Sequence, residues 1–176
     1  GDKLNHASII DGCRLPGAAF RIYPHKNVSQ LESLLQRSSM YQRKLVVTDS
    51  VFSMDGDTAP LPEIVTIAKR YDAILMVDDA HATGVFGKQG KGMIEHCGLE
   101  GKIDIVMGSL SKAVGSIVGF IAGSKPLIDF LKNKARPFIY TTALPPAVCA
   151  ASMAGLTLIQ EDVSLIDTLW KNIAFL

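Results

Sequence analysis

Lys112 is the residue of this chain whose neighbours most clearly suggest a catalytic role. It lies in Gly108–Ser116, a segment rich in glycine and serine that follows an apolar run. The hydroxyl and backbone N–H groups of such a turn can bind a phosphate. A partly desolvated lysine placed there can act as a Schiff-base nucleophile. The residue order of a Walker A loop is absent. Taken alone, the segment is also compatible with a solvated loop lysine.

An acid and an imidazole follow the apolar run Ala73–Val77. Asp78 comes directly after that run, and His81 comes three residues later. In a sheet of parallel strands the carboxyl ends meet at one edge, and ligands bind there. The two side chains are therefore candidates for one site, with an ordinary surface loop as the alternative.

A third polar cluster, Thr48–Asp57, contains Asp49 and Ser53. Its acids lack the spacing and the closing glutamate of a calcium-binding loop, so we expect no metal. Asp55-Gly56 within it is a favourable pair for a tight turn.

The apolar pattern predicts the elements that would position these clusters. Four short runs rich in β-branched residues are typical of strands buried on both faces; they are Lys44–Asp49, Ala73–Asp78, Asp104–Gly108 and Ser116–Ala122. Helical patterns occur over Val28–Gln36, Pro62–Tyr71, Leu127–Ala135, the Ala-rich stretch from Pro146 to Gln160, and Ser164–Phe175. This alternation predicts an α/β fold with a mostly parallel sheet flanked by helices.

Size and charge narrow the classes of function. The 176 residues suffice for one domain with a hydrophobic core. The formal net charge of +1 gives no electrostatic reason to expect nucleic acid or an anionic membrane as a partner. No apolar run is long enough to cross a bilayer, and the chain does not open on a secretory signal pattern. The three cysteines are widely separated, so we expect a reducing, cytoplasmic location.

Five blocks in this order resemble the α-oxoamine synthases, which are pyridoxal-phosphate enzymes of fold type I that condense an amino acid with an acyl thioester. The blocks are Asn5–Ser8, Val51–Asp57, Val77–Gly84, Gly108–Gly115 and Tyr140–Pro146. Together they span nearly the whole chain. The resemblance implies that residues 1–176 form the large, cofactor-binding domain of that fold, with pyridoxal 5'-phosphate as the cofactor.

The resemblance also implies roles for the clustered residues. Lys112 matches the lysine that bonds to the cofactor and moves protons at the substrate α-carbon. Asp78 matches the carboxylate that keeps the pyridinium nitrogen protonated, so that the ring can accept electrons. His81 and Ser53 match groups near the phenolic oxygen of the cofactor.

Further matches surround the same cofactor. His6 matches an imidazole that stacks on the ring, and Ser109 matches a hydroxyl that binds the phosphate. A hydroxyl of Thr141 or Thr142 is implied to reach the phosphate in a neighbouring subunit, which implies a homodimer with a shared site. Asp49 stands where relatives often carry an acid.

Two stretches are most similar to the branch of the family that joins L-alanine to a pimeloyl thioester, carried by coenzyme A or a carrier protein, in biotin biosynthesis. These stretches are Asp2–Gly12 and Arg136–Pro146. The branch that joins glycine to an acetyl thioester shares much of the first stretch and is therefore an alternative assignment. An aminotransferase or lyase of the same fold type, and a non-catalytic module that keeps the sheet and the dimer surface, also stay open. A nucleotide-binding domain is disfavoured, because no Gly-x-Gly-x-x-Gly turn follows a predicted strand.

The chain departs from the family in two respects. Val118-Gly119 stands where many relatives have paired glycines. Family members are also considerably longer, with an N-terminal segment that carries a glycine-rich phosphate turn and a C-terminal domain that carries an arginine for the substrate carboxylate. We therefore expect this chain to be a fragment that lacks both.

Overall fold

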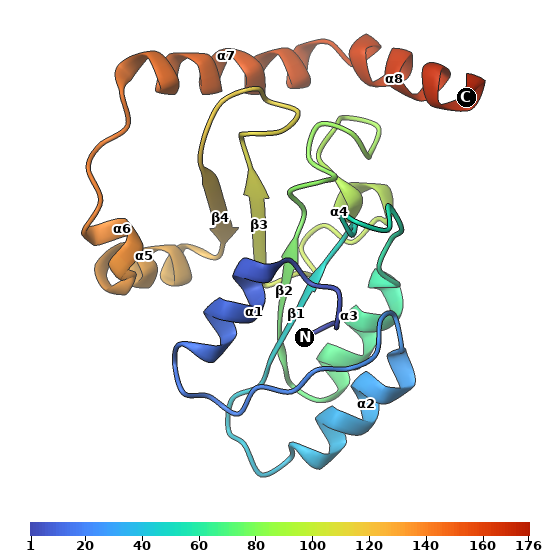
Figure 1. Cartoon of the computed structure of the whole chain (residues 1–176), viewed down its shortest axis with the longest axis vertical. Coiled ribbons are helices and arrows are strands. Elements are labelled where there is room, and N and C mark those ends of the chain that lie inside the picture. The colour runs from blue at the N-terminus through green and yellow to red at the C-terminus, as the bar shows by residue number, and fades with distance from the viewer.

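A four-stranded sheet forms the centre of the computed structural model, which describes residues 1–176 (Figure 1). The strands are β1 (Leu45–Asp49), β2 (Ile74–Asp78), β3 (Ile105–Ser109) and β4 (Gly119–Gly123), and they lie side by side in this order. β1, β2 and β3 are parallel, whereas β4 runs antiparallel to β3. The predicted α/β fold with a mostly parallel sheet is confirmed.

Eight helices accompany the sheet. They are α1 (Ala7–Arg14), α2 (Val28–Arg37), α3 (Leu61–Arg70), α4 (Met93–His96), α5 (Lys125–Lys134), α6 (Arg136–Ile139), α7 (Pro146–Glu161) and α8 (Ser164–Phe175). The five predicted helices correspond to α2, α3, α5, α7 and α8. The sequence pattern did not reveal α4 and α6, because each is a single turn and too short to show a helical period. It also missed α1, which contains a glycine.

Local sequence explains where two of the predicted helices begin and end. The Asn27 side chain accepts a hydrogen bond from the Gln30 backbone N–H at 3.0 Å, which makes it the N-cap of α2. Pro62 lies in the first turn of α3, and Lys69 and Arg70 lie in its last turn. Proline tolerates that first turn, and the cations interact favourably with the helix dipole.

The predicted strand Ser116–Ala122 is wrong at its start, because β4 begins only at Gly119. The preceding residues belong to a closed turn in which the Leu110 N–H donates to the Val118 carbonyl at 2.9 Å. Val118 adopts a positive φ of 78° there. Turn geometry at this point therefore overrides the β propensity of an apolar run.

The hydrophobic core lies around β1, β2 and the helices that cover them. α3 packs on β2, and α2 packs on α3 (Figure 1). Leu61, Ile64, Leu75 and Val77 are almost fully buried there. By contrast, no apolar side chain of α5, α6 or α7 is buried. The hydrophobic effect thus stabilises the first half of the chain more strongly than the second.

α7 and α8 cross the end of the sheet toward which β3 points (Figure 1). The Trp170 indole N–H of α8 donates to the Val85 carbonyl at 2.8 Å, and its ring meets Phe86 edge to face. In α7, the Ser152 hydroxyl contacts the Ser116 hydroxyl at 2.7 Å. The two helices therefore brace the loops that follow β2 and β3.

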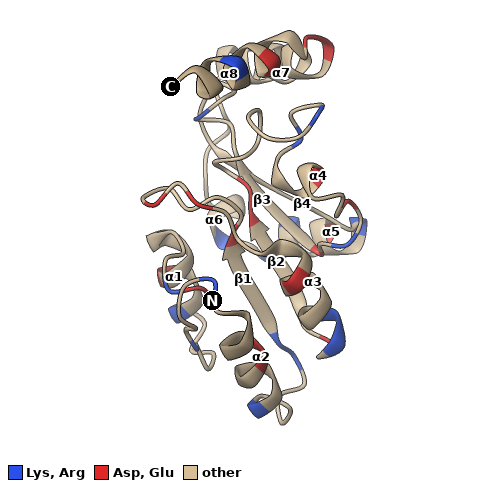
Figure 2. Ribbon diagram, turned by 90° about the vertical axis from the view of Figure 1, so that its right-hand side faces the viewer, with Lys and Arg blue, Asp and Glu red and all other residues tan.

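Charged residues of both signs are interspersed over the molecule, as Figure 2 shows. No helix has the length and apolar character required of a membrane span.

Candidate active site

A cavity of about 290 Å³ opens at the carboxyl ends of β1, β2 and β3. Six of the nine residues that the sequence singled out line it; they are His6, Asp49, Asp78, His81, Ser109 and Lys112. The topology explains this convergence, because parallel neighbouring strands bring their carboxyl ends to one edge of the sheet.

Two acids from adjacent strands occupy one side of this cavity. Asp49 ends β1 and Asp78 ends β2, and the parallel register pairs them directly. Both are buried. One Asp49 oxygen accepts a hydrogen bond from the His6 backbone N–H at 3.2 Å. One Asp78 oxygen accepts a hydrogen bond from the Ala80 N–H at 2.9 Å.

The proximity of the two carboxylates disfavours two negative charges. Burial, followed by the charge of Asp78, raises the pKa of Asp49 to about 7, against the lowering effects of the His6 N–H and of Lys112. A ligand group that is cationic or donates an N–H would relieve this repulsion. The acid side of the cavity is therefore suited to a protonated ring nitrogen.

Replacing Asp49 with asparagine is expected to stabilise the fold at pH 8 by about 1–3 kcal/mol. The folded-state pKa lies above the unfolded value of 3.8, so the wild-type protein loses stability as the pH rises from 3.8 through about 7. Asparagine does not ionise, and its oxygen can still accept the His6 N–H. Urea unfolding at pH 8 and pH 4 checks this. A gain of equal size at both pH values would contradict the electrostatic explanation.

The imidazole of His81 lies on the same cavity and carries little charge at neutral pH. Burial is the main cause that lowers the pKa of His81, and the positive charge of Lys112 lowers it further. The negative charge of Asp78 acts in the opposite direction and raises it. A neutral imidazole can donate one hydrogen bond and accept another.

Lys112 faces the cavity from the turn after β3. That turn is closed on itself, since the Gly115 N–H donates to the Lys112 carbonyl at 3.0 Å and the Ser116 N–H donates to the Leu110 carbonyl at 2.8 Å. The Lys112 amine forms no ion pair. A rigid turn thus presents a free amine to the cavity.

Two hydroxyls lie beside this lysine. The Ser109 and Ser111 oxygens are 2.7 Å apart, and the Ser111 N–H donates to the Ser109 hydroxyl oxygen at 3.1 Å. Both residues line the cavity. Hydroxyls and a backbone N–H in this arrangement provide donors for an anionic oxygen. Sequence reasoning missed Ser111, although it stands next to the selected lysine.

His6 forms the N-cap of α1, where its ring nitrogen Nδ1 accepts from the Ser8 N–H at 3.3 Å. The preceding residue fixes its place. The Asn5 side chain donates to the Val47 carbonyl at 2.8 Å and accepts from the Asp49 N–H at 3.2 Å. One buried amide thus ties the His6 segment to the outer edge of β1.

Comparisons with known proteins identify the family of this chain. The model of the family "Aminotransferase class I and II" matches residues 1–176. The chain belongs to this family. It is 52% identical to 8-amino-7-oxononanoate synthase 1 of Bacillus subtilis over 174 residues, which cover 99% of the chain and 44% of that protein. It is 51% identical to 8-amino-7-oxononanoate synthase of Thermosipho melanesiensis over 171 residues, which cover 97% of the chain and 44% of that protein.

Two solved structures are similar to this chain. A serine palmitoyltransferase from S. paucimobilis with bound PLP superposes with a TM-score of 0.93 at 39% identity, covering 97% of this chain and 43% of that one. An 8-amino-7-oxononanoate synthase from Francisella tularensis superposes with a TM-score of 0.82 at 34% identity, covering 99% and 50%. The resemblance to the α-oxoamine synthases and the fold-type-I assignment are confirmed. The chain spans less than half the length of these curated relatives.

The other three of the nine residues that the sequence singled out do not line the cavity. Ser53 lies in the loop after β1, and its side chain is exposed. Thr141 and Thr142 follow α6 and are also exposed. The structure of this single chain does not bring these hydroxyls to the other six residues.

Asp79 is a buried acid that sequence reasoning did not select. Its carboxylate accepts from the Ser50 hydroxyl at 2.5 Å and from the Met93 N–H at 3.1 Å. Burial raises its pKa to about 6, against these two hydrogen bonds. Successive side chains of an extended segment point to opposite sides. Asp78 therefore faces the cavity, while Asp79 anchors the turn from behind.

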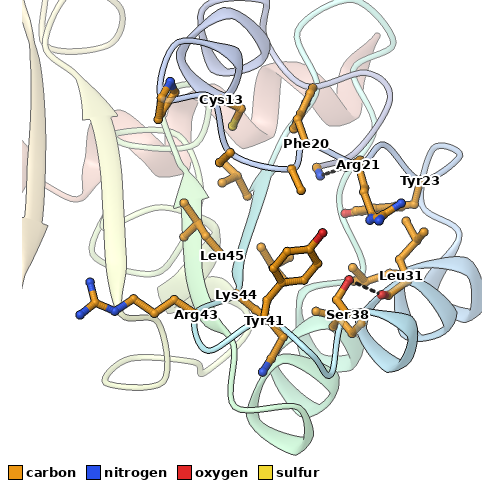
Figure 3. Close-up of a pocket in the computed structure, with 18 of the residues that line it drawn as sticks. Cys13, Phe20, Arg21, Tyr23, Leu31, Ser38, Tyr41, Arg43, Lys44 and Leu45 are labelled. Atoms are coloured by element: carbon orange, nitrogen blue, oxygen red, sulfur yellow. Dashed lines mark hydrogen bonds between the residues drawn. The ribbon is translucent and has the colours of Figure 1, made fainter.

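A larger cavity, of about 590 Å³, lies along the outer edge of β1 and carries none of the nine selected residues. Phe20, Tyr41, Arg43 and Leu45 are among the residues that line it (Figure 3). Chemistry therefore concentrates in the smaller cavity. No group of three or more His, Cys, Asp or Glu side chains is placed to hold a metal ion.

Proposed function

We propose that residues 1–176 form the cofactor-binding part of a pyridoxal-phosphate-dependent acyltransferase. In this proposal the enzyme condenses L-alanine with a pimeloyl thioester and forms 8-amino-7-oxononanoate, carbon dioxide and a free thiol, a step of biotin biosynthesis. The observation that carries it is the cavity in which the free amine of Lys112 shares one space with the paired acids Asp49 and Asp78. The similarity to named 8-amino-7-oxononanoate synthases supports the choice of substrates.

The cavity residues suit pyridoxal phosphate. The acid side favours a protonated nitrogen, because a cation there offsets the repulsion that raises the pKa of Asp49. The serines beside Lys112 offer donors for the phosphate. When bound, the cofactor supplies an electron sink that stabilises negative charge at the substrate α-carbon.

In this proposal, five of the residues that line the cavity have separate roles. Asp78 would hold the ring N–H of the cofactor, and Lys112 would bind the cofactor aldehyde and accept the proton from the substrate α-carbon. His81, neutral at neutral pH because its pKa is lowered, donates to the phenolic oxygen. His6 covers one face of the ring, and Ser109 binds the phosphate. The α-carbon would then attack the thioester carbonyl and expel the thiol, and the carboxylate of the alanine unit would leave as carbon dioxide and be replaced by a proton.

A homodimer forms part of the proposal. Phe130, Phe138 and Tyr140 are large apolar residues of α5, α6 and the following segment, and all are exposed in the single chain. Exposed apolar surface of this kind marks association sites. Thr141 and Thr142 continue the same exposed segment, so a second subunit could use one of these hydroxyls at its phosphate. The three free cysteines support a cytoplasmic location.

Thiol release tests the substrates. The purified protein with pyridoxal phosphate is expected to release free thiol from pimeloyl-coenzyme A or a pimeloyl-carrier protein only when L-alanine is present. Glycine with acetyl-coenzyme A serves as the matched control. Turnover with the control pair alone would instead indicate the glycine branch. Amino-group transfer from alanine to a 2-oxo acid without any thioester would indicate an aminotransferase and contradict the proposal.

A further inference from the structure

A second cluster of titratable groups lies outside the cavity and is centred on His25. Its Nδ1 lies 2.9 Å from an Asp2 oxygen, and its Nε2 lies 3.0 Å from an Asp57 oxygen. The ring also meets Phe52 edge to face, with centroids 4.4 Å apart. Three separate segments of the chain therefore converge on one imidazole.

Hydrogen-bond chemistry fixes the charge of this imidazole. A carboxylate only accepts hydrogen bonds, so both ring nitrogens must donate, and only the imidazolium has two N–H groups. Burial alone would lower the pKa of His25, but the hydrogen bonds to Asp2 and Asp57 outweigh it and raise the pKa above 6.5. His25 is thus a cation that bridges two acids.

One end of the bridge organises the segment that leads to His6. Asp2 is only 2% exposed, and its carboxylate also accepts from the Leu4 N–H at 2.9 Å and from the Lys26 N–H at 2.8 Å. The turn that these bonds form leads into Asn5, which is tied to β1, and then into His6.

The other end of the bridge holds the loop that carries Ser53. Asp57 closes this loop, because the Phe52 N–H donates to the Asp57 carbonyl at 2.9 Å and the Gly56 N–H donates to the Phe52 carbonyl at 2.8 Å. A displacement of Asp57 therefore displaces Ser53 with it.

We propose that His25 is a positioning residue for the cofactor site: its imidazolium joins Asp2 to Asp57 and so holds the His6 segment against the Ser53 loop. The effect of His25 on cofactor binding rests on the proposed function. The bridge between Asp2 and Asp57 rests on the geometry alone. When His25 loses its proton, one nitrogen presents a lone pair to a carboxylate, and that contact becomes repulsive.

The surrounding charges decide which contact opens. Lys26 Nζ lies 2.9 Å from Asp57 and keeps this acid paired after His25 is neutral. Asp57 is 34% exposed and can also be solvated, whereas Asp2 is buried beside the equally buried Tyr23. His25 therefore stays with Asp2 and releases Asp57. Because the pKa of His25 is raised in the folded state, its ionic contacts contribute their full stabilisation of the fold below pH 6.5. This contribution is lost as the pH rises through the folded-state pKa.

Imidazole NMR tests the bridge without any cofactor. The chain has four histidines, so its Cε1–H signals are few and assignable. In wild type we expect His25 to titrate above 6.5, and in Asp57→Asn we expect a midpoint lower by about one unit. At a fixed pH near 6, where His25 is charged, Asp57→Asn should also displace the His6 signal. The His96 signal serves as the internal control, because that ring lies on α4 against Phe86.

Cofactor affinity tests the consequence. At the same pH, Asp57→Asn and His25→Gln are expected to weaken pyridoxal phosphate binding about three- to tenfold, and the control His96→Gln should leave it unchanged. An unshifted His25 midpoint, an undisturbed His6 signal, or an affinity equal to that of wild type in Asp57→Asn and His25→Gln would overturn the inference. If wild type bound no pyridoxal phosphate, the proposed function would fail, and the His25 and His6 signals would still decide whether the bridge positions His6.

Discussion

Replacing Lys112 with alanine is expected to abolish covalent capture of pyridoxal phosphate and to reduce turnover by about 10³-fold or more. Lys112 offers the one lysine amine that lines the cavity, and no ion pair competes for it. Absorbance in the visible range, followed by borohydride reduction and peptide mapping, checks the expectation. In wild type the label should appear on the peptide that contains Lys112.

Lys112→Arg is the matched control for this prediction. Arginine keeps the positive charge near His81, but its guanidinium does not lose its proton and is no nucleophile. We expect this variant to bind the cofactor without covalent capture. A label on Lys88 or Lys91, in the loop after β2, would contradict the assignment of Lys112.

Replacing Asp78 with asparagine is expected to affect function and stability in opposite directions. Without its charge the ring nitrogen is not held protonated, and turnover should fall about 10²- to 10³-fold. The charge of Asp78 also raises the pKa of Asp49, so its removal should stabilise the cofactor-free protein at pH 8 by about 1 kcal/mol. Residues that hold a ligand often reduce the stability of the empty fold in this manner.

Two measurements separate these effects. Urea unfolding without cofactor reports the stability, and steady-state kinetics with saturating cofactor report the turnover. Asp79→Asn is the contrasting variant, because Asp79 binds Ser50 and Met93 rather than the cavity. A loss of stability in Asp78→Asn, or turnover equal to wild type, would contradict the proposed role.

The sequence predicted those parts of the site that depend on where strands end. Asp49, Asp78 and Ser109 are terminal residues of β1, β2 and β3, and such positions follow from short apolar runs in a parallel sheet. The roles of these residues required the family resemblance as well, because a loop lysine or a loop acid has no specific meaning alone. The strand ends and the family resemblance together selected the six residues that line the cavity.

Other features were not predictable, for identifiable physical reasons. The residue pattern alone does not distinguish Asp78 from Asp79, because the choice depends on which side of the strand end faces the cavity; the family resemblance selected Asp78, and Asp78 lines the cavity. The positive φ of Val118 comes from turn closure and not from any preference of valine. The contact of His25 with Asp57 joins residues 32 positions apart, and no local pattern encodes it.

The indole of Trp170 has a practical consequence, since it is the single tryptophan of the chain. Its N–H is bonded to the Val85 carbonyl, four residues after His81 in the loop between β2 and α4. Any undocking of α8 from this loop hydrates the ring and shifts its emission to longer wavelength. Intrinsic fluorescence therefore offers an optical reading of how tightly the C-terminal helix holds the cavity wall, with no engineered label.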